Sequence, residues 1–318
     1  MHNGICTDFQ PVDSAMVAAM VCAIYYSAHD RTDPTQTPGR AFDLTIAAGI
    51  TIAQLLQVAP FGANDNRLLI AHALRLSRTQ LITQSHDILD AQSAHDVNAI
   101  LTRRQTGEPV AYILGSREFY GLSFLVTPAV LIPRAETELL VDLALEHALP
   151  GARIADLGTG SGAIAIAIGR NRSDVHITAT DISQAALDIA RQNAALHRVR
   201  ATFVCGNWLV ALGVQQFDLI VSNPPYIAAG DGHLKQGDLP FEPIEALTDY
   251  ADGLSALRAI ATSASTHLKS GGWLLMEHGY DQADAVRALL AASGFQSVRS
   301  WPDLAGINRV SGGLTPAK

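Results

Sequence analysis

Apolar residues follow a helical spacing in the first part of this chain and a strand-and-turn rhythm in the second. Between Thr51 and Gly107, apolar side chains recur every three to four positions in the segments 51–59, 64–76 and 90–107. Pro60 ends the first segment, and Asn64 and Asp65 are capping-type residues at the start of the second. Gly107 follows the third in the position of a left-handed cap. The pattern predicts a small helical domain with a recognition or packing role.

The pattern changes after this domain. Segments 117–127 and 129–132 are aromatic and β-branched, which predicts a short hairpin, and an amphipathic helix is expected over 136–149. Strand-like segments then follow at 153–157, 175–180, 201–206, 217–222 and 272–279, with helical stretches such as 183–196 and 253–268 between them. This alternation predicts an α/β domain, with a doubly wound, mostly parallel sheet and helices on both faces.

Four parts are expected along the chain. Residues 1–47 form a poorly ordered extension, 48–110 the helical domain, 111–134 the hairpin linker and 135–318 the α/β domain, in which we expect the ligand to bind. The apolar run 15–28 is too short to span a bilayer, and Asp8 and Asp13 precede it where a signal peptide carries Lys or Arg. No membrane association is therefore predicted.

Composition and charge narrow the class of protein. The 318 residues carry a formal net charge of −8, which argues against a protein whose affinity comes from neutralising many phosphates. We therefore expect no stable nucleic-acid binding. Cys6, Cys22 and Cys205 are widely spaced, and the eleven histidines form no Cys/His cluster. No disulfide framework and no metal site are predicted, which suits the reducing cytoplasm.

A glycine turn follows the first strand of the predicted sheet. Gly158, Gly160 and Gly162 let the chain turn tightly and let a ligand lie against the backbone. The spacing loosely matches the dinucleotide fingerprint. Asp156 ends the strand, however, and a carboxylate facing the pocket suits a cationic ligand better than a pyrophosphate.

Acidic and aromatic residues follow the next two strands. Asp181 ends the second strand, at the spacing where an acidic residue binds ribose hydroxyls; capping the following helix is the alternative, although Ser183 can do that. Asn207 and Trp208 follow the third strand, where an adenine edge and face would lie, with ordinary loop packing as the alternative. A cationic, ribose-bearing, phosphate-free ligand is S-adenosylmethionine. The predicted cofactor-binding residues are Asp156, Gly158, Thr159, Gly160, Ser161, Gly162, Asp181, Asn207, Trp208 and Asn223.

The fourth strand runs directly into Asn223, Pro224, Pro225 and Tyr226. The Asn223 side-chain oxygen and the Pro224 carbonyl can each accept one N–H of a planar NH2 group, which places its nitrogen for attack on a methyl group. The prolines stiffen the loop, and Tyr226 can stack on the planar group. A rigid turn without chemistry is the alternative.

These motifs carry a family resemblance. "DLGTGSG" with "NPPY" resembles the class I methyltransferases that modify planar NH2 groups. The segments "EPVAYILGSREFYGL", "VLIPRAETELL", "HLKQGDLPFEPIEAL" and "LLMEHGYDQADAVRALL" resemble the bacterial glutamine-N5 methyltransferases of peptide chain release factors, over roughly residues 51–315. The resemblance implies that residues 158–162, Asp181, Trp208 and Asn223 contact the cofactor region and that residues 223–226 hold the glutamine of a Gly-Gly-Gln motif.

The resemblance further implies a release factor as protein substrate, docked with help from the helical domain and hairpin; we expect a monomeric enzyme. Two residues depart from the family pattern. Asn207 stands where the family has Asp, although its oxygen can still accept from an adenine amine. Ala135 stands where the family has Pro, and the expected effect is a small loss of stability. Neither departure affects Asn223.

Other functions remain as alternatives. A glutamine methyltransferase acting on a ribosomal protein would use the same chemistry on a different docked protein. A DNA adenine-N6 methyltransferase uses the same tetrapeptide on a flipped base, but needs a basic DNA-binding face and a target-recognition domain. A non-catalytic binding module would have no need of an intact Asn-Pro-Pro-Tyr sequence. An NAD oxidoreductase is the weakest alternative.

Overall fold

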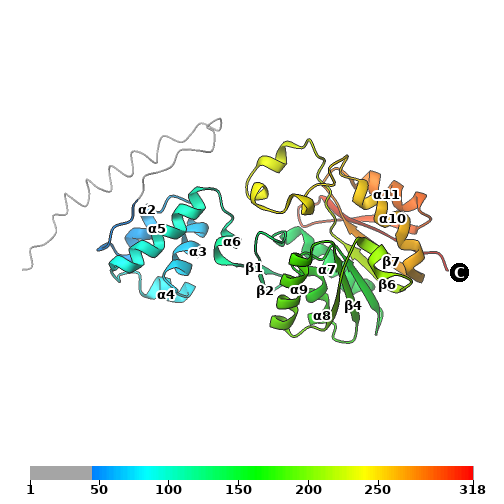
Figure 1. The fold of residues 1–318 in the computed structure, drawn as a ribbon, viewed down its shortest axis with the longest axis horizontal. Coiled ribbons are helices and arrows are strands. Elements are labelled where there is room, and N and C mark those ends of the chain that lie inside the picture. Colours follow the sequence, from blue (N-terminus) through cyan, green and yellow to red (C-terminus); the bar gives the residue numbers. More distant parts are fainter. Residues whose placement is uncertain (1–44, 318) are drawn as a thin grey trace, which may run out of the picture. The chain divides into compact units, whose positions relative to one another are not determined.

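The computed structural model describes residues 45–317. The predicted extension over 1–47 therefore lies outside the described residues, apart from 45–47. The chain divides between Thr106 and Gly107 into two compact units, which are described separately (Figure 1).

The first unit is helical. It contains α2 (Ile52–Val58), α3 (Ala63–Ala73), α4 (Arg78–Thr83) and α5 (Ala91–Gln105), with Leu55, Leu69, Ile70 and Val97 fully buried between them. The predicted cap of α3 is wrong. Its N-cap is Gly62, and Asn64 and Asp65 lie inside the helix, which begins without a side-chain cap.

The second unit begins with α6 (Val110–Leu114) and the antiparallel hairpin of β1 (Ser116–Phe119) and β2 (Leu122–Leu125). Segment 129–132, expected to belong to this hairpin, is not a strand. The register pairs Phe119 with Leu122, so the hairpin closes before this segment is reached. Pro128 and Pro133 flank the segment, and neither can donate to a strand ladder.

The rest of the unit surrounds a seven-stranded sheet in the order β5-β4-β3-β6-β7-β9-β8. Its strands are β3 (Arg153–Leu157), β4 (His176–Asp181), β5 (Ala201–Cys205), β6 (Phe217–Ser222), β7 (Leu268–Glu277), β8 (Gln296–Pro302) and β9 (Asn308–Leu314). Strands β3 to β7 are parallel, and β9 runs antiparallel to β7 and to β8. The predicted mostly parallel α/β fold is confirmed, whereas β8 and β9 were not predicted.

Five α-helices cover the sheet: α7 (Glu138–His147), α8 (Ala163–Asn171), α9 (Gln184–His197), α10 (Ser255–His267) and α11 (Ala283–Ala292). Short 3-10 turns are η1 (Ala135–Thr137), η2 (Trp208–Leu212), η3 (Gly232–Lys235), η4 (Leu239–Phe241) and η5 (Ile244–Ala246). The helical expectation over 136–149 is therefore met by η1 and α7 together, and the expected helix over 183–196 corresponds to α9.

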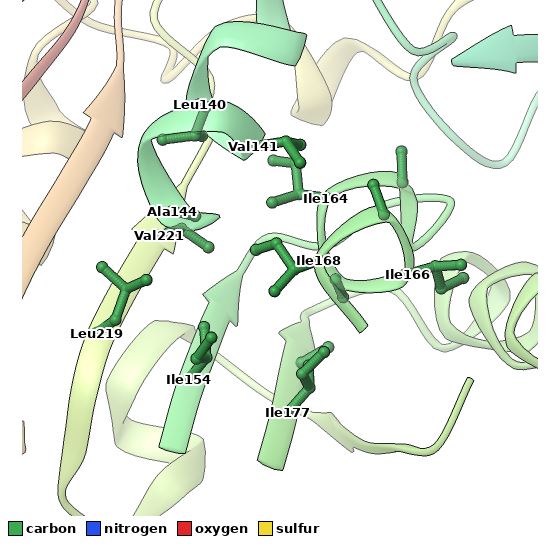
Figure 2. Packing of buried hydrophobic residues seen from close by; sticks show 14 of the residues in the cluster. Leu140, Val141, Ala144, Ile154, Ile164, Ile166, Ile168, Ile177, Leu219 and Val221 are labelled. Atoms are coloured by element: carbon green, nitrogen blue, oxygen red, sulfur yellow. The ribbon is translucent and has the colours of Figure 1, made fainter. Parts of the chain in front are cut away.

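Two hydrophobic clusters fix the sheet between its helices. On one face, Leu140 of α7 and Ile168 of α8 pack against the strands, and Ile154 of β3 points toward them (Figure 2). The next residue of β3, Ala155, belongs to the second cluster, with side chains of α10 and α11 such as Leu257 and Val286. Successive side chains of a strand point to opposite faces, so both faces of β3 are buried. The sheet is a rigid support for the loops at its ends.

One of these loops is held by a buried carboxylate. Glu242, between η4 and η5, has a fully buried side chain that pairs with Arg134 and accepts a hydrogen bond from the backbone N–H of Ile132 at 2.9 Å. The long segment between β6 and α10 is thereby fixed to the chain just ahead of η1. These contacts give a structural role to two of the sequence motifs, "VLIPRAETELL" and "HLKQGDLPFEPIEAL".

Candidate active site

The carboxyl ends of the five parallel strands carry the polar residues singled out in the sequence. The register pairs Leu157 with Ser222 and Ser222 with Met276, so the ends of β3, β6 and β7 are level. Ligands of open α/β sheets bind outside this edge. The residues gathered there are Asp156 and Gly158 from β3 and its turn, Asp181 from β4, Asn207 and Trp208 after β5, Asn223–Tyr226 after β6 and Glu277 from β7.

The glycine turn is shaped by close packing on one side and open space on another. Gly158 has φ +72°, and a Cβ at this position would lie 2.9 Å from Cζ3 of the Trp208 ring. A larger residue would therefore displace the indole as well as strain the backbone. A Cβ at Gly160 would meet no atom within 4 Å. This open side of the turn leaves space for a ligand against the backbone.

Asp181 connects β4 to the glycine turn. Its Oδ2 accepts a hydrogen bond from the backbone N–H of Gly160 at 2.8 Å, and its Oδ1 accepts one from the N–H of Ser183 at 2.9 Å. Ser183 is the N-cap of α9, because its side chain accepts from the N–H of Ala186. The alternative that Asp181 is the N-cap of α9 is therefore excluded. Burial raises the pKa of this carboxyl above its usual value.

Asn207 and Trp208 lie where η2 begins after β5. Trp208 has φ +40°, a left-handed backbone conformation that is uncommon for a bulky residue. Its ring is partly buried on Gly158, and Asn207 beside it is exposed. No hydrogen bond holds the Asn207 side chain among residues 45–317. An adenine contact by this pair stays a prediction.

Asp156 is placed differently from the sequence expectation. Its side chain is fully buried beneath the turn instead of facing the ligand. Oδ2 accepts hydrogen bonds from Thr159 Oγ1 at 2.6 Å and from the backbone N–H of Ala165 in α8 at 3.2 Å. Oδ1 is buried without a partner within the described residues. Burial raises the pKa of Asp156 to about 7, which leaves it only partly ionised at neutral pH.

We expect Asp156→Asn to flatten the pH dependence of stability. The unfolded carboxyl has a pKa of about 3.9, so between pH 4 and 7 the folded state holds a proton that the unfolded state lacks. The stabilisation from this proton is complete below about pH 4 and is lost as pH rises through 7. The variant, which cannot ionise, should lose less unfolding free energy between pH 5 and 8, as measured by urea denaturation.

Asp218→Asn is the matched control. The Lys269 ammonium and the backbone N–H of Arg153 hold the pKa of Asp218 below its usual value despite some burial. It therefore stays ionised in both states from pH 5 to 8, and its replacement should leave the pH dependence in this range unchanged. If the unfolding free energy of Asp156→Asn changes with pH as steeply as that of wild type, the raised pKa assigned to Asp156 is contradicted.

The Asn-Pro-Pro-Tyr segment is held at both ends by side chains that the sequence reasoning did not assign. Asn223 Nδ2 donates to Thr137 Oγ1 of η1 at 3.2 Å, and the Tyr226 hydroxyl donates to Glu277 Oε1 of β7 at 3.2 Å. Thr137 and Glu277 are buried, with exposed fractions of 4% and 2%. The available signal for Glu277 was a carboxylate that ends an otherwise apolar strand, "WLLME".

The pKa values of Glu277 and Tyr226 are set mainly by burial. Burial raises the pKa of Glu277 to about 7, and the Thr137 and Tyr226 hydroxyls oppose the shift by favouring the ionised carboxylate. Burial next to this carboxylate also raises the pKa of Tyr226, so its hydroxyl keeps its proton. Ser222 Oγ donates to the carbonyl of Leu157 at 2.8 Å and ties the start of the segment to β3.

Two further features concern metals and membranes. Within the described residues, no group of three or more His, Cys, Asp and Glu side chains could hold a metal ion. No helix in the part that the structure describes is both long and apolar enough to cross a bilayer.

Comparisons with known proteins agree with this architecture. Residues 135–237 match the family model of the methyltransferase small domain, and residues 50–115 match that of the PrmC N-terminal domain. Together with the sheet order and the glycine turn, the first match makes this chain a class I methyltransferase. The cofactor of this chain is accordingly S-adenosylmethionine, as the sequence predicted.

Named relatives narrow the class to a family. A release factor glutamine methyltransferase of Burkholderia pseudomallei is 51% identical over 275 residues, covering 84% of this chain and 96% of that relative. One from Neisseria gonorrhoeae is 46% identical, covering 82% and 97%. A solved protein-(glutamine-N5) methyltransferase of Alicyclobacillus acidocaldarius is 33% identical, with a TM-score of 0.38, and the match covers 61% of this chain and 99% of that one. This chain belongs to the release factor glutamine methyltransferase family.

The residues present fit the cofactor. The open space at Gly160, the half-buried Asp181 carboxylate that accepts its N–H and the Trp208 ring packed on Gly158 suit a cationic nucleoside better than a phosphate group. The predicted cofactor contacts of residues 158–162, Asp181, Asn207, Trp208 and Asn223 remain predictions. For Asp156 the structure favours support of the turn over direct contact.

Proposed function

We propose that this protein transfers a methyl group from S-adenosylmethionine to the side-chain amide nitrogen of the glutamine in the Gly-Gly-Gln motif of a peptide chain release factor. The observation that carries the proposal is the orientation of Asn223. Its Nδ2 is engaged by Thr137, which leaves Oδ1 as an acceptor next to the Pro224 carbonyl. The names of the relatives support the choice of substrate.

The chain's contribution to the reaction is orientation. The lone pair of an amide nitrogen is delocalised, so this nitrogen attacks poorly unless it is held in place. Asn223 Oδ1 and the Pro224 carbonyl would each accept one N–H of the glutamine amide and oppose the positive charge that develops on nitrogen. Pro224 and Pro225 add no competing backbone donor. The cofactor supplies the electrophilic methyl group.

No strong base is needed in this mechanism. The methylated nitrogen is a much stronger acid than a neutral amide and loses its proton to water. Tyr226, whose hydroxyl is bonded to Glu277, would stack on the planar amide and keep solvent from it. Residues Asn223, Pro224 and Tyr226 are thus the proposed catalytic residues, with Pro225 as part of the substrate-binding loop.

The proposed partner is a release factor, bound with the help of the helical domain and the hairpin linker. We infer a monomeric enzyme that acts in the cytoplasm, where release factors work, and that needs no stable contact with nucleic acid. The domain limits 48–110, 111–134 and 135–318 are part of this proposal. A ribosomal-protein substrate would use the same site chemistry, and DNA adenine methylation fits the acidic chain least well.

The test is mass spectrometry of the substrate peptide. A purified release factor is incubated with this protein and S-adenosylmethionine, and its Gly-Gly-Gln peptide is expected to gain one methyl group on the glutamine. A release factor carrying Gly-Gly-Glu is the control and should remain unmodified. If neither protein is methylated while S-adenosylmethionine still binds, the proposed substrate is wrong, and ribosomal proteins and then DNA are tested next.

A further inference from the structure

The side-chain amide of Gln282 makes hydrogen bonds to the backbone of three separate turns. Gln282 is the N-cap of α11, and its Oε1 accepts from the N–H of Gly279 at 2.9 Å. Its Nε2 donates to the carbonyl of Tyr226 at 3.0 Å and to that of Gly253 at 3.2 Å. The turn after β7 is thereby joined to the end of the Asn-Pro-Pro-Tyr segment and to the turn before α10.

These three partners match the donors and acceptor of a glutamine amide. A backbone N–H can only donate and a backbone carbonyl can only accept, so one side chain has to supply one acceptor and two donors. A primary amide has this set, whereas a carboxylate only accepts and an ammonium only donates. The hydrogen-bond network, which is what distinguishes the two ends of a side-chain amide, here leaves one orientation.

Two of the three partners are also held by other residues. The Asp249 carboxylate accepts from the N–H of Gly253 at 2.9 Å. The fully buried ring of His278 lies with Nδ1 2.8 Å from the carbonyl of Gly279, and Nδ1 is the donor because a carbonyl can only accept. Both glycines are thus fixed independently of Gln282. What the Gln282 side chain adds is a restraint on the backbone of Tyr226.

The close approach of Gly253 makes this restraint tight. Gly253 has φ +76°, and a Cβ at this position would lie 2.5 Å from the Tyr226 carbonyl oxygen and 2.9 Å from Gln282 Nε2. A side chain at 253 would therefore displace the carbonyl and the amide that holds it, as well as strain the backbone. The Tyr226 carbonyl lies against Gly253 as well as against the Gln282 amide.

We propose that Gln282 is a positioning residue, which holds the Tyr226 carbonyl and thereby keeps the Tyr226 ring against the substrate amide. This inference rests on the proposed function and adds a residue to it. Pro224 and Pro225 have no N–H that could restrain the segment. The hydroxyl of Tyr226 is bonded to Glu277 at 3.2 Å, which holds the far end of the side chain. Gln282 holds its backbone end, so the ring is fixed at two points.

The first test compares two substitutions of Gln282. Gln282→Met keeps the length of the side chain but removes its hydrogen bonds, and should lower kcat for Gly-Gly-Gln methylation about tenfold, the effect of about one hydrogen bond. Gln282→Glu keeps the acceptor for Gly279 but directs an oxygen at the two carbonyls, and should lower kcat at least as far. The affinity for S-adenosylmethionine should be unchanged in both.

Wild-type kcat in either folded variant would overturn the proposal. Urea unfolding establishes that each variant is folded under the assay conditions. Gln282→Glu, which keeps the bond to Gly279 and with it the turn ahead of α11, decides the question if the Met variant does not fold.

Gln192→Met is the matched control. Gln192 also donates from its side-chain amide to a backbone carbonyl, that of Asp188 at 3.2 Å, but it is exposed on α9. The same substitution there removes the same kind of bond from another element, so kcat should stay at the wild-type value. A fall in kcat equal to that of Gln282→Met would show that loss of any such bond harms the enzyme, and the positioning role would be wrong.

A double-mutant cycle distinguishes positioning from a purely structural role. If Gln282 acts through the Tyr226 ring, Gln282→Met should lower kcat by less than about twofold in a Tyr226→Ala background, against about tenfold in wild type. A purely structural role would lower the unfolding free energy but leave kcat of the folded enzyme unchanged. Equal losses of kcat in both backgrounds would show that Gln282 does not act through Tyr226, and would contradict the proposal.

A last measurement needs no substrate and separates this inference from the proposed function. The chain has seven tyrosines, so ¹³C labelling of tyrosine carbonyls gives few NMR signals, and that of Tyr226 is assigned by its loss in Tyr226→Phe. This signal should shift in Gln282→Met and stay in place in Gln192→Met. An unchanged signal in Gln282→Met would refute the restraint. If wild type fails to methylate the Gly-Gly-Gln peptide, the proposed function is wrong, and the carbonyl signal alone decides whether Gln282 holds Tyr226.

Discussion

Replacing Asn223 with alanine is expected to lower kcat for glutamine methylation by at least about 100-fold, the typical cost of removing one preorganised polar group at a charge-developing atom. In the proposed mechanism the Asn223 side chain supplies one of two acceptors for the amide N–H groups, and the Pro224 carbonyl alone would leave the nitrogen free to rotate. The measurement is single-turnover methylation of a Gly-Gly-Gln peptide with saturating cofactor, followed by mass spectrometry.

The fold should survive this change. Among residues 45–317 the Asn223 side chain makes one hydrogen bond, the 3.2 Å contact with Thr137, and a neutral bond of this kind contributes about 1 kcal/mol. Urea unfolding should therefore show at most a small loss of stability. Wild-type turnover in the folded variant would contradict the orientation mechanism, because catalysis would then depend on other groups.

Replacing Asp181 with alanine is expected to raise the dissociation constant for S-adenosylmethionine about 30-fold, which corresponds to about 2 kcal/mol. The change removes a half-buried carboxylate that holds the N–H of Gly160 at 2.8 Å. It would also remove the proposed acceptor for the ribose hydroxyls, and hydrogen bonds to charged groups contribute about 1.5–3 kcal/mol. Isothermal titration calorimetry gives the constant directly.

Asp188→Ala provides the control for charge. Asp188 lies on the following helix, α9, and is exposed with an ion pair to Arg191, so it matches Asp181 in charge but lies outside the glycine turn. Its replacement should leave the dissociation constant within twofold. If Asp181→Ala binds the cofactor as tightly as wild type, the ribose lies elsewhere on the carboxyl edge of the sheet.

The sequence predicted the parallel part of the sheet because each strand there carries its own local signal. Segments such as 153–157 and 217–222 are apolar runs that end in a turn residue. Strands β8 and β9 carry weaker signals: β8 has the burial pattern of an edge strand, and β9 contains Gly312 and Gly313 at places where a Cβ would be crowded. β9 pairs with β7 and with β8, and such pairing between distant segments cannot be predicted from the local sequence of either strand.

The candidate site was predictable to a similar extent. Residues at strand ends could be assigned together because parallel strands bring their carboxyl ends to one edge. The burial of Asp156 could not be read from the sequence, since a carboxylate before a glycine turn can face the ligand or support the turn. Thr137 was missed for a different reason: it precedes β3 in the chain, in η1, and only the tertiary fold brings it to Asn223.

The contact between Gly158 and the Trp208 ring links two turns that follow different strands of the sheet. Because any side chain at 158 would meet the indole at 2.9 Å, residue 158 cannot be enlarged while Trp208 stays in place. Enlarging residue 158 requires a smaller residue at 208, and that exchange would remove the aromatic ring that we predict to face the adenine. A redesign of the predicted adenine site that enlarges residue 158 therefore has to change residue 208 in the same step.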